Sequence, residues 1–248
     1  MHVTVKNLKE IIDEINKKIN DLNYNPNIIA VTKTFNIEII EPLIEYGHIH
    51  FGENKIQEAI IKWSETKKKN KFIKLHMIGK LQTNKVKDAL KIFDFIHSVD
   101  SEKLANKISN EQKKIIAKPK IFIQINIGEE SQKSGINPKN IIEFYKYCKS
   151  LDLDVIGTMC IPPINQEPST YFKQMFDINN NLKIQELSMG MSSDYLLALD
   201  NKSTYLRIGS KIFGQRNYSI FIFVFLSIRL RIIKKSFFET AIHPAVDL

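Results

Sequence analysis

The chain has 248 residues, of which 43% are apolar and 25% charged, and its formal net charge is +9. This composition is typical of a soluble globular protein and excludes a disordered chain, while the length fits one large domain such as an α/β barrel. Because Lys and Glu are mixed along most segments, the positive charge is diffuse and favours small anions over nucleic acid.

Cysteine content and the N-terminal pattern indicate the compartment. Cys148 and Cys160 are the two cysteines of the chain, too few for a disulfide framework, and their spacing matches no metal-binding motif. From Met1 the sequence enters an amphipathic pattern directly, without the basic and apolar regions of a secretory signal. We therefore expect a cytoplasmic protein.

The first predicted elements are a helix and a strand. Apolar residues recur at steps of three and four over 5–22, which places them on one face of a helix. The short apolar run 28–32 is rich in β-branched residues and predicts a strand that is buried on both faces. Lys33 stands at the C-terminal end of this strand.

The same unit of helix, turn and short strand repeats along the chain. Further strands are predicted over 48–51, 74–78, 95–99, 121–127, 155–160, 186–189 and 205–208. Helical patterns fall between them, for example over 37–46, 56–66, 80–91, 103–112 and 138–150. Eight strands that alternate with helices predict an α/β fold whose parallel sheet closes as a single (β/α)8 TIM barrel. An open, doubly wound sheet is the alternative.

Several polar residues along these elements are interpreted as structural. The basic run 67–71 indicates a solvated loop, and Lys80 and Lys85 a basic helix face. Glu53, Gln57 and Glu58 either supply polar groups near the predicted barrel mouth or form the solvated first turn of a helix.

Two histidines were considered as metal ligands. His48 and His50 fall on one side of a predicted strand, but no cluster of carboxylates or cysteines accompanies them. No metal site is therefore expected.

In parallel sheets and barrels, ligands bind beyond the C-terminal ends of the strands. The residues at these predicted ends include the amine of Lys33, the amide of Asn54, the guanidinium of Arg207, several hydroxyls and glycine turns. This set suits a phosphorylated, aromatic, electrophilic ligand. Lys33 is either a solvent-facing side chain or an amine nucleophile whose pKa is lowered by burial at the barrel mouth.

Two turns at these ends combine glycine with serine. They are Ser-Met-Gly-Met-Ser-Ser-Asp at 188–194 and Arg-Ile-Gly-Ser at 207–210. The first could be a plain strand-to-helix turn with a serine N-cap. Backbone N–H groups and a serine hydroxyl in such turns also bind phosphate, and barrels often bind phosphate after strands 7 and 8, where both segments fall. A phosphate site is therefore predicted here.

The segment 218–248 breaks the alternating pattern, so we predict a barrel domain over 1–217 and a divergent tail that is not a separate domain. The apolar run 220–226 is far short of the ~20 residues that span a bilayer, and no transmembrane span is expected. An interfacial anchor, a docking element and a divergent C-terminal sequence are the alternatives for the tail.

Long sequence strings occur in an order that identifies a family. They are AVTKT at 30–34, FGENKIQE at 51–58, HMIGKLQTNK at 76–85, SVDS at 98–101, IQINIGEESQKSG at 123–135, GTMCIPP at 157–163, LSMGMSSDY at 187–195 and STYLRIGSKIFGQR at 203–216. Together they resemble the pyridoxal phosphate homeostasis protein family, also called the YggS/PROSC family. The departures, such as Thr32 in place of serine, remove no ligand of that family.

The resemblance implies a fold like the N-terminal barrel of alanine racemase, with pyridoxal 5'-phosphate (PLP) bound as a Schiff base to Lys33. It also implies that Arg207 faces the pyridine nitrogen and that Asn54 lies near the ring or Lys33. The phosphate would be held by Ser192, Gly209 and Ser210.

The implied function is vitamin B6 homeostasis, in which the protein carries or buffers PLP without robust catalysis. An arginine opposite the ring nitrogen keeps this nitrogen unprotonated and weakens the ring as an electron sink. The alternative is a PLP-dependent amino-acid racemase, which needs acid and base groups on both faces of the substrate. The segment after residue 217 is too short for the β-domain that supplies one of them in alanine racemase. We expect a monomer whose partners are PLP and PLP-dependent apoenzymes.

Overall fold

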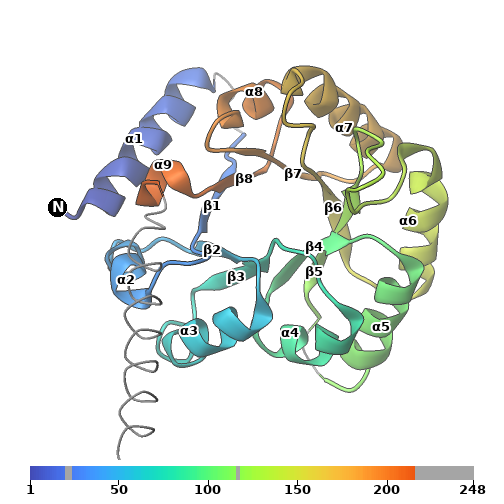
Figure 1. Cartoon of the computed structure of the whole chain (residues 1–248), viewed down its shortest axis with the longest axis horizontal. Helices are drawn as coiled ribbons and strands as arrows, with labels where there is room; N and C mark the ends of the chain where they lie inside the picture. Colours follow the sequence, from blue (N-terminus) through green and yellow to red (C-terminus); the bar gives the residue numbers. More distant parts are fainter. Residues whose placement is uncertain (20–23, 116–117, 216–248) are drawn as a thin grey trace, which may run out of the picture. The chain divides into compact units, whose positions relative to one another are not determined.

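The computed structural model describes residues 1–19, 24–115 and 118–215. In this part of the chain, eight parallel strands close into a barrel in sequence order, with helices around it (Figure 1). The strands are β1 (Asn27–Val31), β2 (His50–Glu53), β3 (Lys74–Met77), β4 (Phe95–Val99), β5 (Lys120–Ile125), β6 (Val155–Cys160), β7 (Glu186–Met191) and β8 (Tyr205–Ile208). The predicted (β/α)8 barrel is confirmed, and the open sheet is wrong.

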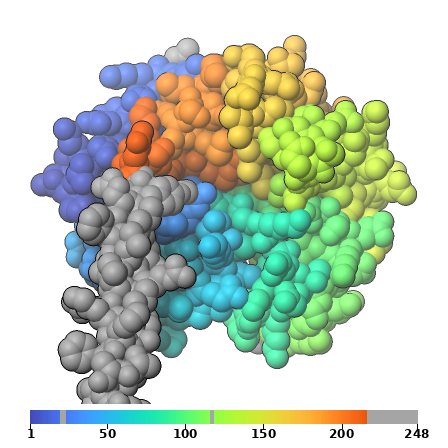
Figure 2. Space-filling model, in the orientation of Figure 1, coloured from blue at the N-terminus to red at the C-terminus, as the bar shows by residue number. Residues whose placement is uncertain are grey.

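Helices fall between the strands, so that successive segments lie side by side around the ring (Figure 2). They are α1 (Val3–Lys18), α2 (Ile37–Glu45), α3 (Ile56–Lys69), α4 (Val86–Ile92), α5 (Glu102–Gln112), α6 (Ile141–Ser150), α7 (Pro168–Leu182), α8 (Tyr195–Asp200) and α9 (Ser210–Phe213), with 3₁₀ turns η1 (Thr83–Lys85) and η2 (Pro138–Asn140). The helix predicted over 5–22 corresponds to α1, although residues 20–23 lie outside the described part.

The core has two layers because strand side chains alternate between the two faces of the closed sheet. The side chains that point outward from the strands pack against the apolar faces of amphipathic helices. In α1 this apolar face includes Leu8, Ile11 and Ile15. Inward side chains form a separate apolar cluster of Ile29, Phe95, Phe122, Met159 and Tyr205. The barrel is thus a filled core whose ligand site must lie at one end.

Three local predictions are wrong. Residues 67–69 are not a loop but the last turn of α3, where basic side chains complement the helix dipole. Lys67 also lies 2.6 Å from the Asp94 carboxylate. The helix predicted over 80–91 is only η1 and α4, because the chain is still extended at Gln82. Lys80 and Lys85 therefore do not share a helix face.

The predicted pairing of His48 with His50 on one side of a strand is also wrong. His48 precedes β2 and packs edge-on against Phe51, with ring centroids 5.1 Å apart. His50 instead contacts the interior rings of Phe95 and Tyr205.

Residues Met1–Phe213 form one compact unit, and Gly214–Leu248 are grouped separately. The interpretations of 218–248 concern residues outside the described part of the chain. In the part that is described, no helix is long and apolar enough to cross a bilayer.

Candidate functional site

Strand register brings three of the predicted site residues to one edge of the barrel. Val31 of β1 pairs with Gly52 of β2, and both segments continue two residues further, to Lys33 and Asn54. On the other side of β1, a Cβ placed on Gly209 would lie 3.3 Å from the Val31 Cβ. Lys33, Asn54 and Gly209 therefore follow the C-terminal ends of three adjacent strands.

Strand alternation indicates where the Arg207 side chain points. Tyr205 belongs to the interior cluster, and Arg207 is two residues beyond it on β8, so Arg207 falls on the interior side. Lys33 is partly buried in the turn after β1, whereas Arg207 is buried with 5% of its surface exposed.

The turn that carries Lys33 is held in an unusual backbone conformation. Thr34 has φ of 72°, in the left-handed region that β-branched residues rarely adopt. Its backbone N–H donates to Glu58 Oε1 at 2.6 Å. Burial alone would raise the pKa of Glu58, but hydrogen bonds from Thr34 and Lys62 lower it below its ordinary value. An ionised carboxylate of α3 therefore anchors the Lys33 turn.

A buried ion pair supports the other side of this turn. Glu53, which is fully buried, accepts hydrogen bonds at Oε1 from Thr32 Oγ1 (2.7 Å), Lys62 Nζ (2.9 Å) and Trp63 Nε1 (2.9 Å). Lys62 also donates to the Thr32 carbonyl at 2.8 Å. The interpretation of Glu53 as part of a solvated helical turn is wrong, because Glu53 ends β2 and points outward beneath α3.

Asn54 presents a buried acceptor without a protein partner. Its Oδ1 has no hydrogen bond within the described part of the chain. The neighbouring backbone is tightly packed, since a Cβ on Gly79 would lie 2.4 Å from the Asn54 carbonyl oxygen. A buried acceptor of this kind calls for a bound group or a water molecule.

Arg207 reaches across the end of the barrel to two other strands. Its Nη1 donates to Ser188 Oγ of β7, and its Nη2 to the Cys160 carbonyl of β6, both at 2.8 Å. Burial lowers the pKa of Arg207 below its ordinary value, but a guanidinium remains charged in proteins. Because it has five N–H donors and these bonds use two, it can donate further to a ligand.

The two glycine-serine turns meet. Ser192 Oγ accepts from the backbone N–H of Gly209 at 3.1 Å and of Lys211 at 3.4 Å. Within the described residues its own hydroxyl hydrogen has no assigned acceptor, so it can donate to an anion. The first turn needs Gly190, because φ is +85° there and a Cβ would lie 2.6 Å from the Ala198 Cβ. Ser210 is exposed at the start of α9.

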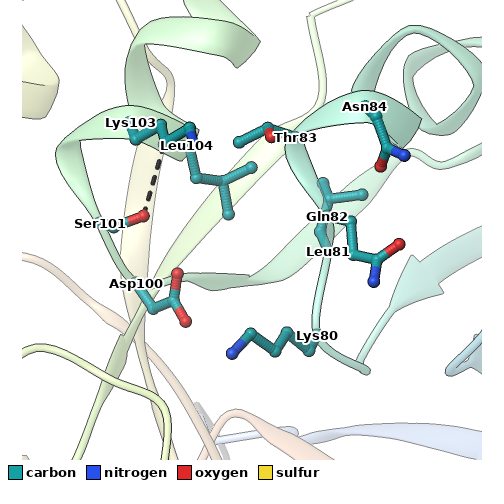
Figure 3. A pocket seen from close by; sticks show the side chains of 9 residues that line it. All are labelled: Lys80, Leu81, Gln82, Thr83, Asn84, Asp100, Ser101, Lys103 and Leu104. Atoms are coloured by element: carbon teal, nitrogen blue, oxygen red, sulfur yellow. Dashed lines mark hydrogen bonds between the residues drawn. The ribbon is translucent and has the colours of Figure 1, made fainter.

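A surface hollow of about 510 Å³ lies elsewhere on the rim (Figure 3). It is formed by the segment after β3 and by the start of α5, and includes Lys80, Thr83, Asp100, Ser101 and Lys103. None of the predicted site residues lines it, so it is distinct from the group around Lys33 and Arg207.

Two buried histidines that connect to Arg207 through Ser188 were not predicted from the sequence. His76 and His97 are fully buried, and His97 Nδ1 lies 2.9 Å from Ser188 Oγ. The sequence did contain one indication of such contacts. Each of two predicted buried strands contains a histidine, and a buried polar side chain needs a hydrogen-bond partner. The sequence could not show which partner each ring has.

Comparisons with known proteins place this geometry in a class. The family model described as alanine racemase, N-terminal domain, matches residues 3–217. A pyridoxal phosphate homeostasis protein from Aquifex aeolicus is 32% identical over 85% of this chain and 97% of its own length. Its counterpart from Pasteurella multocida is 38% identical over 77% of this chain and 87% of its own.

The solved structure of PipY from Synechococcus elongatus with PLP bound is also similar. It is 30% identical, with a TM-score of 0.75 over 85% of this chain and 100% of PipY. The fold and the polar strand ends thus define a barrel of the alanine racemase N-terminal domain class. Within that class, the chain belongs to the pyridoxal phosphate homeostasis protein family.

Proposed function

We propose that this protein binds PLP covalently through the Lys33 amine and serves in PLP homeostasis without robust catalysis. The observation that carries the proposal is the convergence of Lys33, Arg207 and the Ser192–Gly209 contact at the strand ends of a barrel from this family. PipY, a structural relative, is solved with PLP bound.

The chemistry of these residues fits PLP at each part of the molecule. An anionic phosphate would be held by the hydroxyls of Ser192 and Ser210 at the turn of Gly209, whose backbone N–H donates to Ser192 Oγ and so positions that hydroxyl. Arg207 has N–H donors available for the ring nitrogen, and the unpaired Asn54 Oδ1 accepts a hydrogen bond near the ring or Lys33. Lys33 supplies the amine at the same edge.

When bound, PLP supplies an aldehyde that condenses with amines and a conjugated ring that withdraws electrons. Lys33 provides the amine and fixes the group at the barrel mouth. Arg207 would donate a hydrogen bond to the ring nitrogen but retain its proton, because a guanidinium does not deprotonate in proteins. It would therefore leave that nitrogen unprotonated, which would favour holding the group over carbanion chemistry.

Reduction with borohydride tests the covalent attachment. The PLP-loaded wild type should show a Schiff-base absorbance band, and reduction should fix one pyridoxyl phosphate group on the peptide that contains Lys33. Lys33→Ala should lose this adduct. Lys80→Ala is the matched control, because Lys80 lies on the rim at the separate hollow. An adduct of equal occupancy on Lys33→Ala would show that another lysine holds PLP.

The absence of robust turnover is a separate part of the proposal. Its support is the charged Arg207 and the family's relatives, which are named as homeostasis proteins. Assays with common amino acids should show no sustained racemisation by the PLP-loaded protein. Sustained turnover that Lys33→Ala abolishes would favour the racemase alternative.

We further propose that the protein is a cytoplasmic monomer that exchanges PLP with apoenzymes. Cys148 and Cys160 are both free and buried, which is compatible with a reducing compartment. Light scattering on the full chain tests the monomer. Transfer of PLP to an apoenzyme, at a rate that depends on the concentration of that apoenzyme, tests the exchange.

A further inference from the structure

A continuous line of hydrogen bonds runs through the barrel interior and ends at Arg207. His50 Nδ1 lies 2.9 Å from His76 Nε2, and His76 Nδ1 lies 2.9 Å from His97 Nε2. His97 Nδ1 is 2.9 Å from Ser188 Oγ, which accepts from Arg207. We call His50, His76 and His97 the histidine column; it crosses strands β2, β3 and β4.

Aromatic rings hold the column in place. His97 stacks on Phe122 and His76 on Phe95, with ring centroids 4.2 Å apart in both pairs. Tyr205 lies edge-on to His97, at 6.1 Å between centroids. Because turning a ring out of its stack would lose these contacts, the ring planes of His76 and His97 are fixed.

The hydrogen bonds along this line all run in one direction from donor to acceptor. Arg207 can only donate, so Ser188 Oγ accepts its hydrogen bond and the serine hydroxyl hydrogen is free to be donated to His97 Nδ1. His97 then carries its proton on Nε2 and donates to His76, which donates to His50 in the same way. The opposite direction leaves the Ser188 hydroxyl hydrogen without an acceptor in the described part of the chain.

The charges agree with this direction. Burial lowers the pKa of His97 well below 6.5, and the nearby charge of Arg207 lowers it further. Burial and the neighbouring histidines likewise keep the pKa of His76 low. The column is therefore neutral at physiological pH, and Arg207 is the charged member of the line.

The protein partners of Arg207 in the described residues, Ser188 and the Cys160 carbonyl, are both uncharged. A buried cation needs fixed dipoles when no carboxylate pairs with it. A serine hydroxyl can rotate, so Ser188 presents its lone pair steadily to Arg207 only if its hydrogen is held elsewhere. His97 provides that acceptor, and His76 and His50 fix the protonation state of His97.

We propose that Ser188 and the histidine column are positioning residues for Arg207, which hold its guanidinium in one orientation toward the bound cofactor. The inference rests on the proposed function, since it gives the purpose of fixing Arg207. It assigns a positioning role to residues of the barrel interior, of which Ser188 contacts Arg207 directly.

The test compares Ser188→Ala with Ser203→Ala. Both serines are fully buried, and among the described residues Ser203 Oγ donates to backbone carbonyls, for example Met189 O at 2.7 Å, and to no side chain of the line, so its removal perturbs the same region without removing a hydrogen bond of the line. Ser188→Ala should weaken PLP binding about tenfold, the effect of losing one hydrogen bond to a charged group. It should also shift the pH midpoint of the cofactor absorbance. Ser203→Ala should leave the midpoint unchanged, and Ser188→Thr, which keeps the hydroxyl, should restore it.

A second readout needs no cofactor. Nitrogen-15 spectra of the histidine-labelled full chain should show His50, His76 and His97 as neutral Nε2–H tautomers, and Ser188→Ala should change the His97 signals. If the wild type binds no PLP, the proposed function fails while these spectra still test the column. Unchanged His97 signals in Ser188→Ala, or equal shifts of the absorbance midpoint in both alanine variants, would overturn the proposal.

Discussion

The Glu53 carboxylate lies 2.9 Å from the Lys62 ammonium, and the two side chains are 0% and 7% exposed. This pair contacts the residue before Lys33, because Glu53 accepts from the Thr32 hydroxyl and Lys62 donates to the Thr32 carbonyl. A buried pair of this kind makes the shape of the Lys33 turn depend on α3.

Removal of one member of this pair should be costly. Lys62→Met leaves the Glu53 charge buried with only neutral donors, and we expect the free energy of unfolding to fall by about 3 kcal/mol. Urea denaturation measures it. Lys68→Met is the matched control on the same helix, because the Lys68–Glu65 pair is 72% and 75% exposed and should contribute at most about 0.5 kcal/mol. Equal losses in both variants would contradict a buried charge at Glu53.

Thr34, the residue after Lys33, has a strained backbone conformation, and a substitution that relieves this strain should stabilise the protein. Asparagine adopts the left-handed region more readily than threonine, so Thr34→Asn should raise the free energy of unfolding by about 1 kcal/mol. Thermal denaturation should show a higher Tm. Thr170→Asn, at an exposed position inside α7, is the control and should be neutral or slightly destabilising. A lower Tm for Thr34→Asn would mean that the threonine side chain itself stabilises the turn.

The barrel could be predicted from the sequence because each strand is a short apolar run and each helix is amphipathic, and both patterns are local. Lys33 could be placed at a strand end for the same reason, but its proposed role came from the family resemblance. The surroundings of Glu53 could not, because its burial depends on a strand that ends two residues later than predicted and on Trp63 packing over it.

The histidine column could not be predicted from the sequence, for a different reason. His97 and Ser188 are 91 residues apart, and their contact requires the closed barrel with its actual register. A histidine in a buried strand indicates that the ring has a polar partner, but it does not show which residue that partner is. Arg207 was assigned a role through family resemblance, while the residues that hold Arg207 needed the three-dimensional structure.

The buried histidines predict a specific loss of stability in acid. Burial lowers the pKa of His48 and of His50 to about 4, although Asp94 raises and Lys74 lowers that of His50. In the unfolded chain a histidine has a pKa of about 6.5. Between these values the unfolded state binds protons that the folded state does not, so stability is complete above about pH 6.5 and falls as the pH drops toward 4.

We expect a loss on the order of 1–2 kcal/mol per buried histidine between pH 7 and pH 5. Urea denaturation across this range measures the slope. Carboxylates such as Glu58, whose pKa is lowered from 4.5, lose their contribution only at lower pH and leave this window to the histidines. His48→Gln should reduce the slope by the share of one group. A stability that is flat from pH 7 to pH 5 would contradict the neutral state of these rings.

The contact between Ser192 and Gly209 leads to a prediction about binding of the PLP phosphate. Ser192 Oγ accepts two backbone hydrogen bonds and keeps its hydroxyl hydrogen for an anion. Ser192→Ala removes that donor, so PLP affinity should fall about tenfold. Pyridoxal, which lacks the phosphate, should bind both proteins equally. The neighbouring Ser193 is exposed, and Ser193→Ala should bind PLP like the wild type. Titration of absorbance measures all three proteins. An equal loss of affinity for pyridoxal and PLP would place the effect of Ser192 at the ring and not at the phosphate.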